Sequence, residues 1–365
     1  MIPLFELLKM GLGQECLNAI DILPSLTKKD WKTLRRMADK QGVSAIAFDG
    51  LNRAIREYGR ENICPAIDHS WWKAFVIDWI GLSQKVKRQN AQQLLVMEEM
   101  ANKWTYYGCR VMVMKGQANG TFYPKPESRS PGDIDCYLFE NYAKGNDIAR
   151  EVEAKVDESW YKHSVISYKG ETFENHQFFV HTRDGKRSKL LEKELEEALK
   201  VDKHLFAHLT KSVVKPPVQW TAMFLTYHAC AHFISEGLRL KQLLDWAMFL
   251  NTHQGDVDWQ DFYSFCDRHH LRRFADAATA ICVDYLGLII TRPDITTTSP
   301  FSERILNSTL YDEDYVFSSG KSGWQNRLHI IKNLWRYQWK YKDIYEESIW
   351  RQLWYYFSGY TFHTE

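Results

Sequence analysis

The fold is decided by two stretches of the chain, Val111-Met112-Val113-Met114-Lys115-Gly116 and Gly132-Asp133-Ile134-Asp135-Cys136-Tyr137-Leu138. The first is an apolar run that ends in a glycine turn, which is typical of a strand buried on both faces. The second predicts another strand, along which Asp133 and Asp135 point to the same side because side chains alternate. The two carboxylates repel each other unless a divalent cation neutralises them, and oxygen-only ligands suit Mg²⁺. We therefore predict a metal site; the alternative is an exposed strand start with two solvated acids.

Further elements surround these two strands. The pattern predicts a short helix over residues 116–123, ended by two prolines, and a charged helix over residues 141–156. Residues 164–168 and 172–181 predict a hairpin around Lys169-Gly170. On its second strand Glu174 shares a face with His176. The order strand, helix, strand, helix and hairpin predicts a small α/β sheet of about a hundred residues.

Helical periodicity dominates on both sides of this sheet. Apolar residues recur at three- and four-residue intervals over residues 3–12, 27–41, 44–58 and 70–100, and again over 218–235, 238–252, 259–269 and 272–285. Thr27, with Asp30 three positions later, predicts a helix N-cap. We expect an α+β protein with three parts: an N-terminal helical region (1–94), a sheet-containing core (95–187) and a C-terminal helical region (188–365).

The composition is that of a globular protein of 365 residues, with 45% hydrophobic and 25% charged residues and a formal net charge of +1. This balance provides no overall field to attract nucleic acid or an anionic membrane surface. The seven cysteines have no regular spacing, which argues against a disulfide framework or a structural zinc site. The chain begins without a signal-peptide pattern, and its apolar windows are far shorter than the ~20 residues of a membrane span. We expect a soluble, cytoplasmic protein.

Several motifs together resemble those of a known family. They are Lys115-Gly116, Tyr123-Pro124, Arg129 and Gly132-Asp133-Ile134-Asp135. This combination is similar to the signature of an uncharacterised nucleotidyltransferase-like family within the DNA polymerase β-like nucleotidyltransferase superfamily. Glu174-Asn175-His176 resembles the downstream acidic strand of that family, and residues 228–246 resemble its helical C-terminal half. The resemblance extends over residues 95–250.

The resemblance implies a fold, an activity and a metal site. The sheet-containing region would be a nucleotidyltransferase-like core that moves a nucleotidyl group from an NTP to an acceptor hydroxyl. Two divalent ions, Mg²⁺ or Mn²⁺, would bind the triphosphate and activate the hydroxyl. Asp133 and Asp135 would hold metal, and Glu174 would complete the site and assist the acceptor, with Glu171 as the competing third acid. The small net charge favours a small-molecule or protein acceptor over a long nucleic acid.

The resemblance also implies which residues contact phosphate. The turn at Gly116 would let backbone N–H groups approach it, and Lys115 and Arg129 would supply positive charge. Gln117 stands where the superfamily pattern has a serine that hydrogen-bonds phosphate. The implied nucleotide-binding set is therefore Lys115, Gly116, Gln117 and Arg129.

Two other functions stay open at this point. One is a non-catalytic module on the same fold that binds a nucleotide or a partner. The other is a metal-dependent phosphohydrolase built from His228 and His232, which lie one turn apart on a predicted helix, and Asp245 on the next helix. The two histidines could also contact the nucleotidyltransferase cleft or be hydrogen-bonded structural residues. For Asp245 the sequence favours an ion pair with Arg239 that joins two helices.

Overall fold

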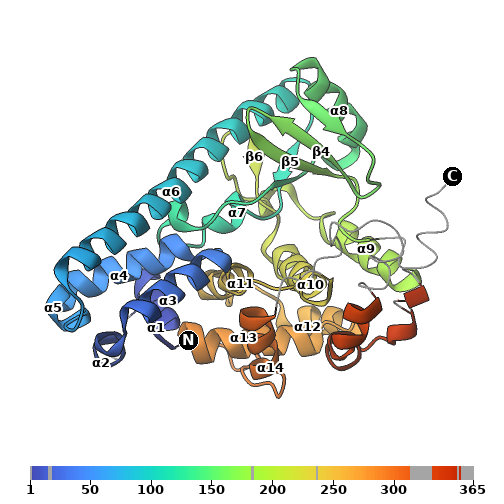
Figure 1. Ribbon diagram of the computed structural model, residues 1–365. Coiled ribbons are helices and arrows are strands. Elements are labelled where there is room, and N and C mark those ends of the chain that lie inside the picture. Colours follow the sequence, from blue (N-terminus) through green and yellow to red (C-terminus); the bar gives the residue numbers. More distant parts are fainter. Residues whose placement is uncertain are drawn as a thin grey trace.

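The chain folds around one six-stranded mixed sheet with helices on both sides, as the computed structural model shows (Figure 1). The structure describes residues 2–14, 19–181, 185–235, 237–312, 331–351 and 353–354. The strand order is β3-β4-β5-β2-β1-β6. The strands are β1 (Val111–Val113), β2 (Ile134–Tyr137), β3 (Lys155–Asp157), β4 (His163–Tyr168), β5 (Glu171–His176) and β6 (Val213–Val214). This architecture confirms the predicted α+β class.

The two predicted strands and the predicted hairpin correspond to β1, β2, β4 and β5. Two edge strands were not predicted, because β3 has three residues and β6 only two, too few to display an alternating pattern. β3 uses the end of the predicted helix 141–156. The helix that forms, α8 (Tyr142–Glu151), stops where Glu153 adopts a positive φ of 61°. The predicted strand 172–181 ends at His176.

Helices account for most of the remaining chain. They are α1 (Ile2–Gly11), α2 (Ala19–Ile22), α3 (Lys28–Lys40), α4 (Ser44–Tyr58), α5 (Arg60–Ile63), α6 (His69–Tyr106), α7 (Gln117–Gly120), α9 (Lys186–Ala198), α10 (Val218–Ser235), α11 (Leu240–His253), α12 (Trp259–Arg268), α13 (Arg272–Leu286) and α14 (Ser302–Tyr311). The predicted N-cap is confirmed: Thr27 accepts a hydrogen bond from the N–H of Asp30, and Asp30 accepts one from the N–H of Thr27.

The two faces of the sheet have different surroundings. One face packs against α6 and α8 and buries Ile134, Cys136 and Phe173 in a core shared with Trp104. The other face is turned toward α10, which lies below the sheet in Figure 1. Since side chains alternate, the burial of Ile134 and Phe173 on one face sends Asp135 and Glu174 to the other.

The helical regions before and after the sheet form one core. Side chains of α1 and α4 share this core with α10, α11 and α13, and Met112 and Met114 join it from the sheet. The boundary predicted after residue 94 falls inside α6, a single helix of 38 residues that runs along the upper left edge of the molecule (Figure 1). The division into three regions stays a prediction.

Two further observations concern expectations from composition. The described cysteines, Cys64, Cys109, Cys136, Cys230, Cys266 and Cys282, are unpaired and buried, in agreement with the argument against a disulfide framework; Cys16 lies outside the described residues. None of the described helices is long and apolar enough to cross a membrane. The cytoplasmic location stays a prediction.

Helices α1 and α4 touch backbone to backbone through two glycines. A Cβ atom on Gly50 would overlap the carbonyl oxygen of Leu7, and one on Gly11 would overlap that of Ile46. Neither neighbouring atom belongs to a flexible side chain, so the helices would have to separate to admit a methyl group.

Gly50→Ala should therefore lower the free energy of unfolding by about 1–3 kcal/mol, the usual cost of overpacking, although alanine favours a helix more than glycine does. Gly81→Ala is the matched control, because its Cβ would meet nothing within 4 Å on the exposed side of α6. We expect this control to gain about 0.5–1 kcal/mol. Urea unfolding of both variants measures the difference; equal shifts would contradict the close approach of α1 and α4.

Glu192 of α9 accepts two backbone hydrogen bonds from the segment that follows β5. Its Oε1 accepts the N–H of Phe179 at 2.9 Å, and its Oε2 accepts that of Val180 at 2.7 Å. Burial nevertheless raises the pKa of Glu192 from 4.5 to about 7. The folded state therefore holds this proton more tightly than the unfolded state does, which stabilises the fold at low pH.

The contribution of this proton should disappear as the pH rises through the interval between the two pKa values. We expect the wild type to lose about 2–3 kcal/mol relative to Glu192→Gln between about pH 5 and pH 8, because glutamine has a similar shape and does not titrate. Urea unfolding at several pH values measures this difference. A difference that does not change with pH would show that Glu192 has an ordinary pKa in the folded protein.

Candidate active site

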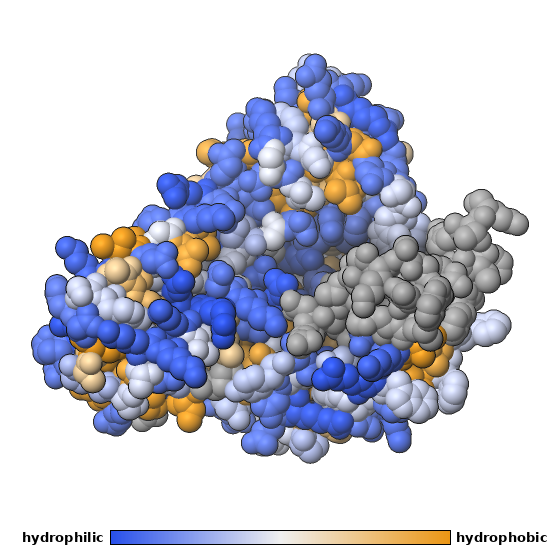
Figure 2. Space-filling view, viewed as in Figure 1, coloured by the Kyte–Doolittle hydropathy of each residue, from blue (hydrophilic) through white to orange (hydrophobic). Residues whose placement is uncertain are grey.

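A cavity of about 740 Å³ lies between the sheet and α10. Figure 2 shows the molecule hollowed below the sheet, with hydrophilic residues around the recess. Ionisable side chains from four parts of the chain line the cavity: Lys115 and Asp133 beside β1 and β2, Lys162, His163 and Glu174 from the hairpin, Arg187 from α9, and His228 and His232 from α10. The cavity therefore collects residues that lie more than a hundred positions apart in the sequence.

Strand register brings the acidic side chains together. In the parallel pair of β2 and β5, Asp135 lies directly beside Glu174. Asp133 comes two residues before Asp135 and lines the cavity, as the alternation predicts. In the hairpin, the two-residue turn at Lys169 and Gly170 has positive φ values of 48° and 85°. This turn pairs β4 with β5 so that His163 lies opposite His176.

Asp135 is the most enclosed of the three acids, with 2% of its surface exposed. The Lys115 Nζ lies 3.0 Å from its Oδ1, and the His176 Nε2 lies 3.3 Å from the same oxygen. Burial alone would raise the pKa of Asp135, but the charge of Lys115 and the hydrogen bond to His176 outweigh it and hold the pKa well below the usual range. Asp135 is therefore ionised, and the Lys115 ammonium supplies a neighbouring positive charge.

Asp133 and Glu174 carry the remaining negative charge. Burial raises the pKa of Asp133, and the charges of Glu174 and Asp135 raise it further. The Glu174 Oε2 lies 3.3 Å from the His176 Nε2, and its Oε1 lies 3.6 Å from the His163 Nε2. Burial would raise the pKa of Glu174, yet the hydrogen bond to His176 outweighs it and the pKa is lowered.

Asp133 and Glu174 line the cavity and Asp135 is buried beside Glu174, but the three acids do not form one tight cluster. Among the described residues, the group whose possible ligand atoms all lie within 4.8 Å of one another is His163, Glu174 and His176. Glu171, the competing third acid, lies at the opposite end of β5, where its Oε2 is 3.4 Å from Gln93 Nε2 of α6. Glu171 points to the same face of the sheet as Phe173, away from the cavity, so Glu174 is the acid that faces the cavity.

The histidine pair of α10 faces the same cavity. The Lys115 Nζ lies 2.6 Å from the His228 Nε2, and the His232 Nε2 lies 3.3 Å from that nitrogen. Burial, together with the nearby Lys115 charge, lowers the pKa of His228 well below its usual range. His228 is therefore neutral and accepts a hydrogen bond from the Lys115 ammonium. Of the roles considered for the two histidines, contact with the cleft is the one that the structure supports.

Asp245 has a different partner from the one predicted. It binds Arg129 through two parallel hydrogen bonds, from Nε to Oδ1 and from Nη2 to Oδ2, each 2.7 Å long. Tyr123 Oη and Asn119 Nδ2 donate to the same carboxylate at 2.7 and 3.1 Å. All four groups are buried. The predicted pair of Asp245 with Arg239 is therefore wrong.

This buried network also removes two predicted roles. Arg129 does not line the cavity, because its guanidinium is directed at Asp245 on α11, so an Arg129 contact with triphosphate finds no support. Asp245 is likewise separated from the histidine pair: among the described residues it forms no ligand group with His228 and His232. The described residues therefore give no support to the phosphohydrolase site.

The glycine turn lies close to the acids, whereas the side chain of the next residue points away from them. Gly116 has a φ of 65°, and its added Cβ would lie 3.5 Å from the carbonyl oxygen of Asp133, so the turn passes close to the first acid. Gln117 is directed at α6, where its Nε2 donates to Asn90 Oδ1 at 3.1 Å and to Gln93 Oε1 at 2.9 Å. Gln117 does not line the cavity and fastens α7 to α6 instead of facing a ligand.

Sequence reasoning missed several basic or imidazole side chains at the site, including Arg187 of α9. Lys162 and His163 line the cavity at the start of β4, and burial lowers the pKa of Lys162. Lys241 of α11 lies close to Gly132 and Asp133, and burial lowers its pKa to about 8. Lys162 and His163 could have been found by counting outward from the two-residue turn, but no local pattern marks Lys241.

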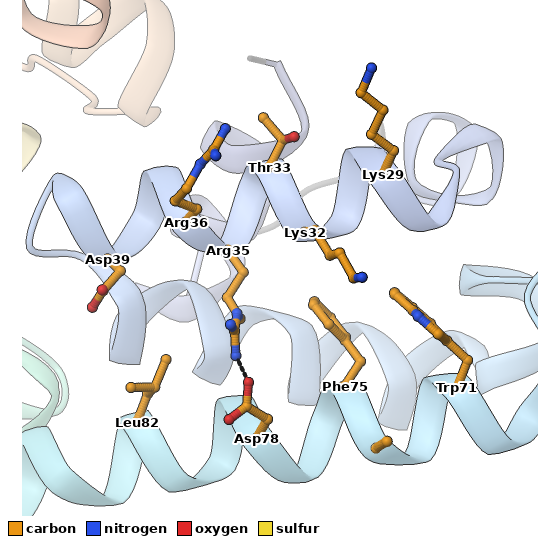
Figure 3. A pocket seen from close by; sticks show the side chains of 11 residues that line it. Lys29, Lys32, Thr33, Arg35, Arg36, Asp39, Trp71, Phe75, Asp78 and Leu82 are labelled. Atoms are coloured by element: carbon orange, nitrogen blue, oxygen red, sulfur yellow. Dashed lines mark hydrogen bonds and ion pairs between the residues drawn. The ribbon is translucent and has the colours of Figure 1, made fainter.

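A second cavity, of about 670 Å³, lies between α3 and α6. Figure 3 shows Lys32 beside the rings of Trp71 and Phe75, and Arg35 paired with Asp78 across the groove. Its two acids, Asp39 and Asp78, belong to no group of three possible metal ligands among the described residues. The cavity below the sheet is therefore the candidate active site.

Comparison with known proteins identifies a family. A family model described as an uncharacterised nucleotidyltransferase matches residues 27–287, which include the whole sheet and the helices from α3 to α13. No curated protein and no solved structure gives a significant match. The matched region contains Asp133, Asp135 and Glu174 together with the lysines and histidines that face them. The chain belongs to this family of uncharacterised nucleotidyltransferases.

Proposed function

We propose that the protein transfers a nucleotidyl group from an NTP to the hydroxyl of an acceptor with the help of divalent metal ions. One observation carries this proposal: Asp133, Asp135 and Glu174 lie on one face of the sheet, with Asp133 and Glu174 lining the cavity and Asp135 buried directly beside Glu174. Family membership supports the class of reaction.

The residues present fit a divalent cation. Asp133 has no ion pair among the described residues, and its raised pKa reflects burial and the repulsion of two neighbouring carboxylates. A cation beside these acids would remove that repulsion. Asp133 and Asp135 would hold metal, with Glu174 as the third acid. Bound metal would neutralise the triphosphate and make the acceptor hydroxyl more acidic.

Two lysines are placed to bind the triphosphate. Lys115 lies between Asp135 and His228. Lys162 lines the cavity and has no ion pair among the described residues, so its charge is available to an anion. In this proposal Lys162 takes the role first expected of Arg129, and Gly116 keeps the turn close to the acids. Glu174, whose lowered pKa keeps it ionised, is the group that would accept a proton from the acceptor.

The acceptor is proposed to be a small molecule or a protein side chain. Trp160, Tyr227, Tyr341 and Tyr345 line the cavity beside the charged groups. Aromatic rings with polar tips suit a mostly apolar ligand that carries a hydroxyl. The net charge of +1 gives no general attraction for a long nucleic acid.

A non-catalytic nucleotide- or partner-binding module is the second candidate. The observation that favours it is the Lys115 ammonium, which lies 3.0 Å from Asp135, where a metal ion would otherwise lie. A protein without metal-dependent activity could keep this ion pair and still bind a phosphate group through Lys162.

Incubation of the purified protein with each α-³²P-labelled NTP, in Mg²⁺ or Mn²⁺, separates the two functions. Fractionated cell extract supplies small-molecule and protein acceptors. Transfer predicts release of pyrophosphate and label on an acceptor. Nucleotide binding without pyrophosphate release would favour the module, and the absence of both would reject the nucleotide altogether.

A further inference from the structure

The tightest group of metal-ligand atoms at the site is not the set of three acids. It consists of His163 on β4 and of Glu174 and His176 on β5, and the possible ligand atoms of these residues all lie within 4.8 Å of one another. The rings of the two histidines have centroids 5.0 Å apart. The hairpin register holds them together, since His163 is paired directly with His176.

The hydrogen bond at Nδ1 of His176 determines which ring nitrogen faces the carboxylates. His176 Nδ1 lies 3.1 Å from the carbonyl oxygen of Phe178. A carbonyl oxygen only accepts, so Nδ1 carries the proton. The other ring nitrogen, Nε2, then faces Glu174 Oε2 and Asp135 Oδ1, each 3.3 Å away.

The hydrogen bonds from Nε2 to the two carboxylates place a proton between them, and a divalent cation would take the place of that proton. A histidine whose outer nitrogen donates to a backbone carbonyl while its inner nitrogen faces carboxylates is the usual arrangement of a metal ligand. His176 is also 2% exposed, which fixes its orientation. The geometry is therefore preset for a cation at Nε2.

His163 adds a second nitrogen to this space. Its Nε2 lies 3.6 Å from Glu174 Oε1, and its Nδ1 is buried without a hydrogen-bond partner among the described residues. No hydrogen bond therefore holds the ring away from Glu174. Two imidazole nitrogens beside carboxylates suit Mn²⁺, Co²⁺ or Zn²⁺, whereas Mg²⁺ prefers a set made of oxygens alone.

We propose that His163, Glu174 and His176 bind a divalent transition-metal ion, Mn²⁺, Co²⁺ or Zn²⁺, with Asp135 beside them as a further oxygen ligand. The inference deepens the proposed function, on which it rests for the use of the metal in transfer. Binding of the metal can be measured without any nucleotide, so failure of the one and failure of the other are separate results.

The test uses the full-length, metal-free protein and metal ions alone. Titration with Mn²⁺, followed by the loss of the free-ion electron paramagnetic resonance signal, gives the affinity, and Mg²⁺ is added as a competitor. We expect Mg²⁺ to compete at least about tenfold more weakly than Mn²⁺. Pulsed resonance of bound Mn²⁺ should show coupling to ¹⁴N from imidazole.

Variants test the ligands one at a time. His163→Gln and His176→Gln should each weaken Mn²⁺ binding by at least about tenfold. His204→Gln is the matched control, because it removes an imidazole that is 93% exposed and outside the cavity; its Mn²⁺ affinity should equal that of the wild type. Circular dichroism checks that each variant is folded.

Three results would overturn the proposal. They are the absence of ¹⁴N coupling in the wild type, equal affinity for Mg²⁺ and Mn²⁺ with both histidine variants unaffected, and no saturable Mn²⁺ binding at millimolar concentration. The first is measured on the unaltered protein, so it decides the matter even if His176→Gln does not fold. Lack of nucleotidyl transfer would leave the metal result unchanged.

Discussion

Asp135→Asn should reduce nucleotidyl transfer by about 10³-fold or more, which corresponds to roughly 4 kcal/mol of transition-state stabilisation. Asp135 lies beside Glu174 in the sheet and within 3.3 Å of both Lys115 and His176. Asparagine keeps the shape of the side chain but removes the charge that would hold metal and position Lys115. The rate of pyrophosphate release from labelled NTP measures the loss.

Two further variants make this result specific. Asp133→Asn should cause a similar loss, because Asp133 lines the cavity and the charges of Glu174 and Asp135 raise its pKa. Asp147→Asn makes the same chemical change on α8, where the side chain is 71% exposed, and should leave transfer unchanged. Asp135→Asn protein that is folded and retains more than a tenth of the wild-type rate would contradict the assigned role.

Local patterns in the sequence predicted most of the parts of this fold. The apolar run at residues 111–114, the alternation around Asp135 and the turn at Lys169-Gly170 correspond to β1, β2 and the β4–β5 hairpin. These features depend on neighbours in the chain, which is why periodicity reveals them. The strand β6 has no such signal, since two residues beside β1 become a strand only through pairing with a distant segment.

The site was predicted less completely than the fold. Asp133 and Asp135 were predicted from strand alternation and Glu174 from the family resemblance, and the register of β2 and β5 places Asp135 beside Glu174. The partners of the acidic side chains were not predicted, because packing between helices determines which basic side chain lies beside a carboxylate. Arg129, for example, binds Asp245, which is 116 residues away in the sequence. The position of His163 was not predicted, although the sequence contains the information for it. Its pairing with His176 follows from a two-residue turn, and that count could have been made from the sequence.

Asp245→Ala should strongly destabilise the fold, lowering the free energy of unfolding by about 3–5 kcal/mol. The change would leave the Arg129 guanidinium buried without a counter-ion. It would also remove the acceptor of the hydrogen bonds from Tyr123 and Asn119. Urea or thermal unfolding measures the loss, and Asp294→Ala is the control, since its pair with Arg292 is exposed and should matter little.

The double variant Arg129→Met with Asp245→Leu separates the ion pair from the packing around it. Removing both charges avoids the uncompensated guanidinium, so the double variant should be clearly more stable than Asp245→Ala. Its nucleotidyl transfer should also stay close to that of the wild type, because neither residue lines the cavity. If Asp245→Ala were no more destabilising than Asp294→Ala, water would have to reach Arg129. If the stable double variant lost transfer by 10²-fold or more, Arg129 would regain the phosphate-binding role that its contact with Asp245 now argues against.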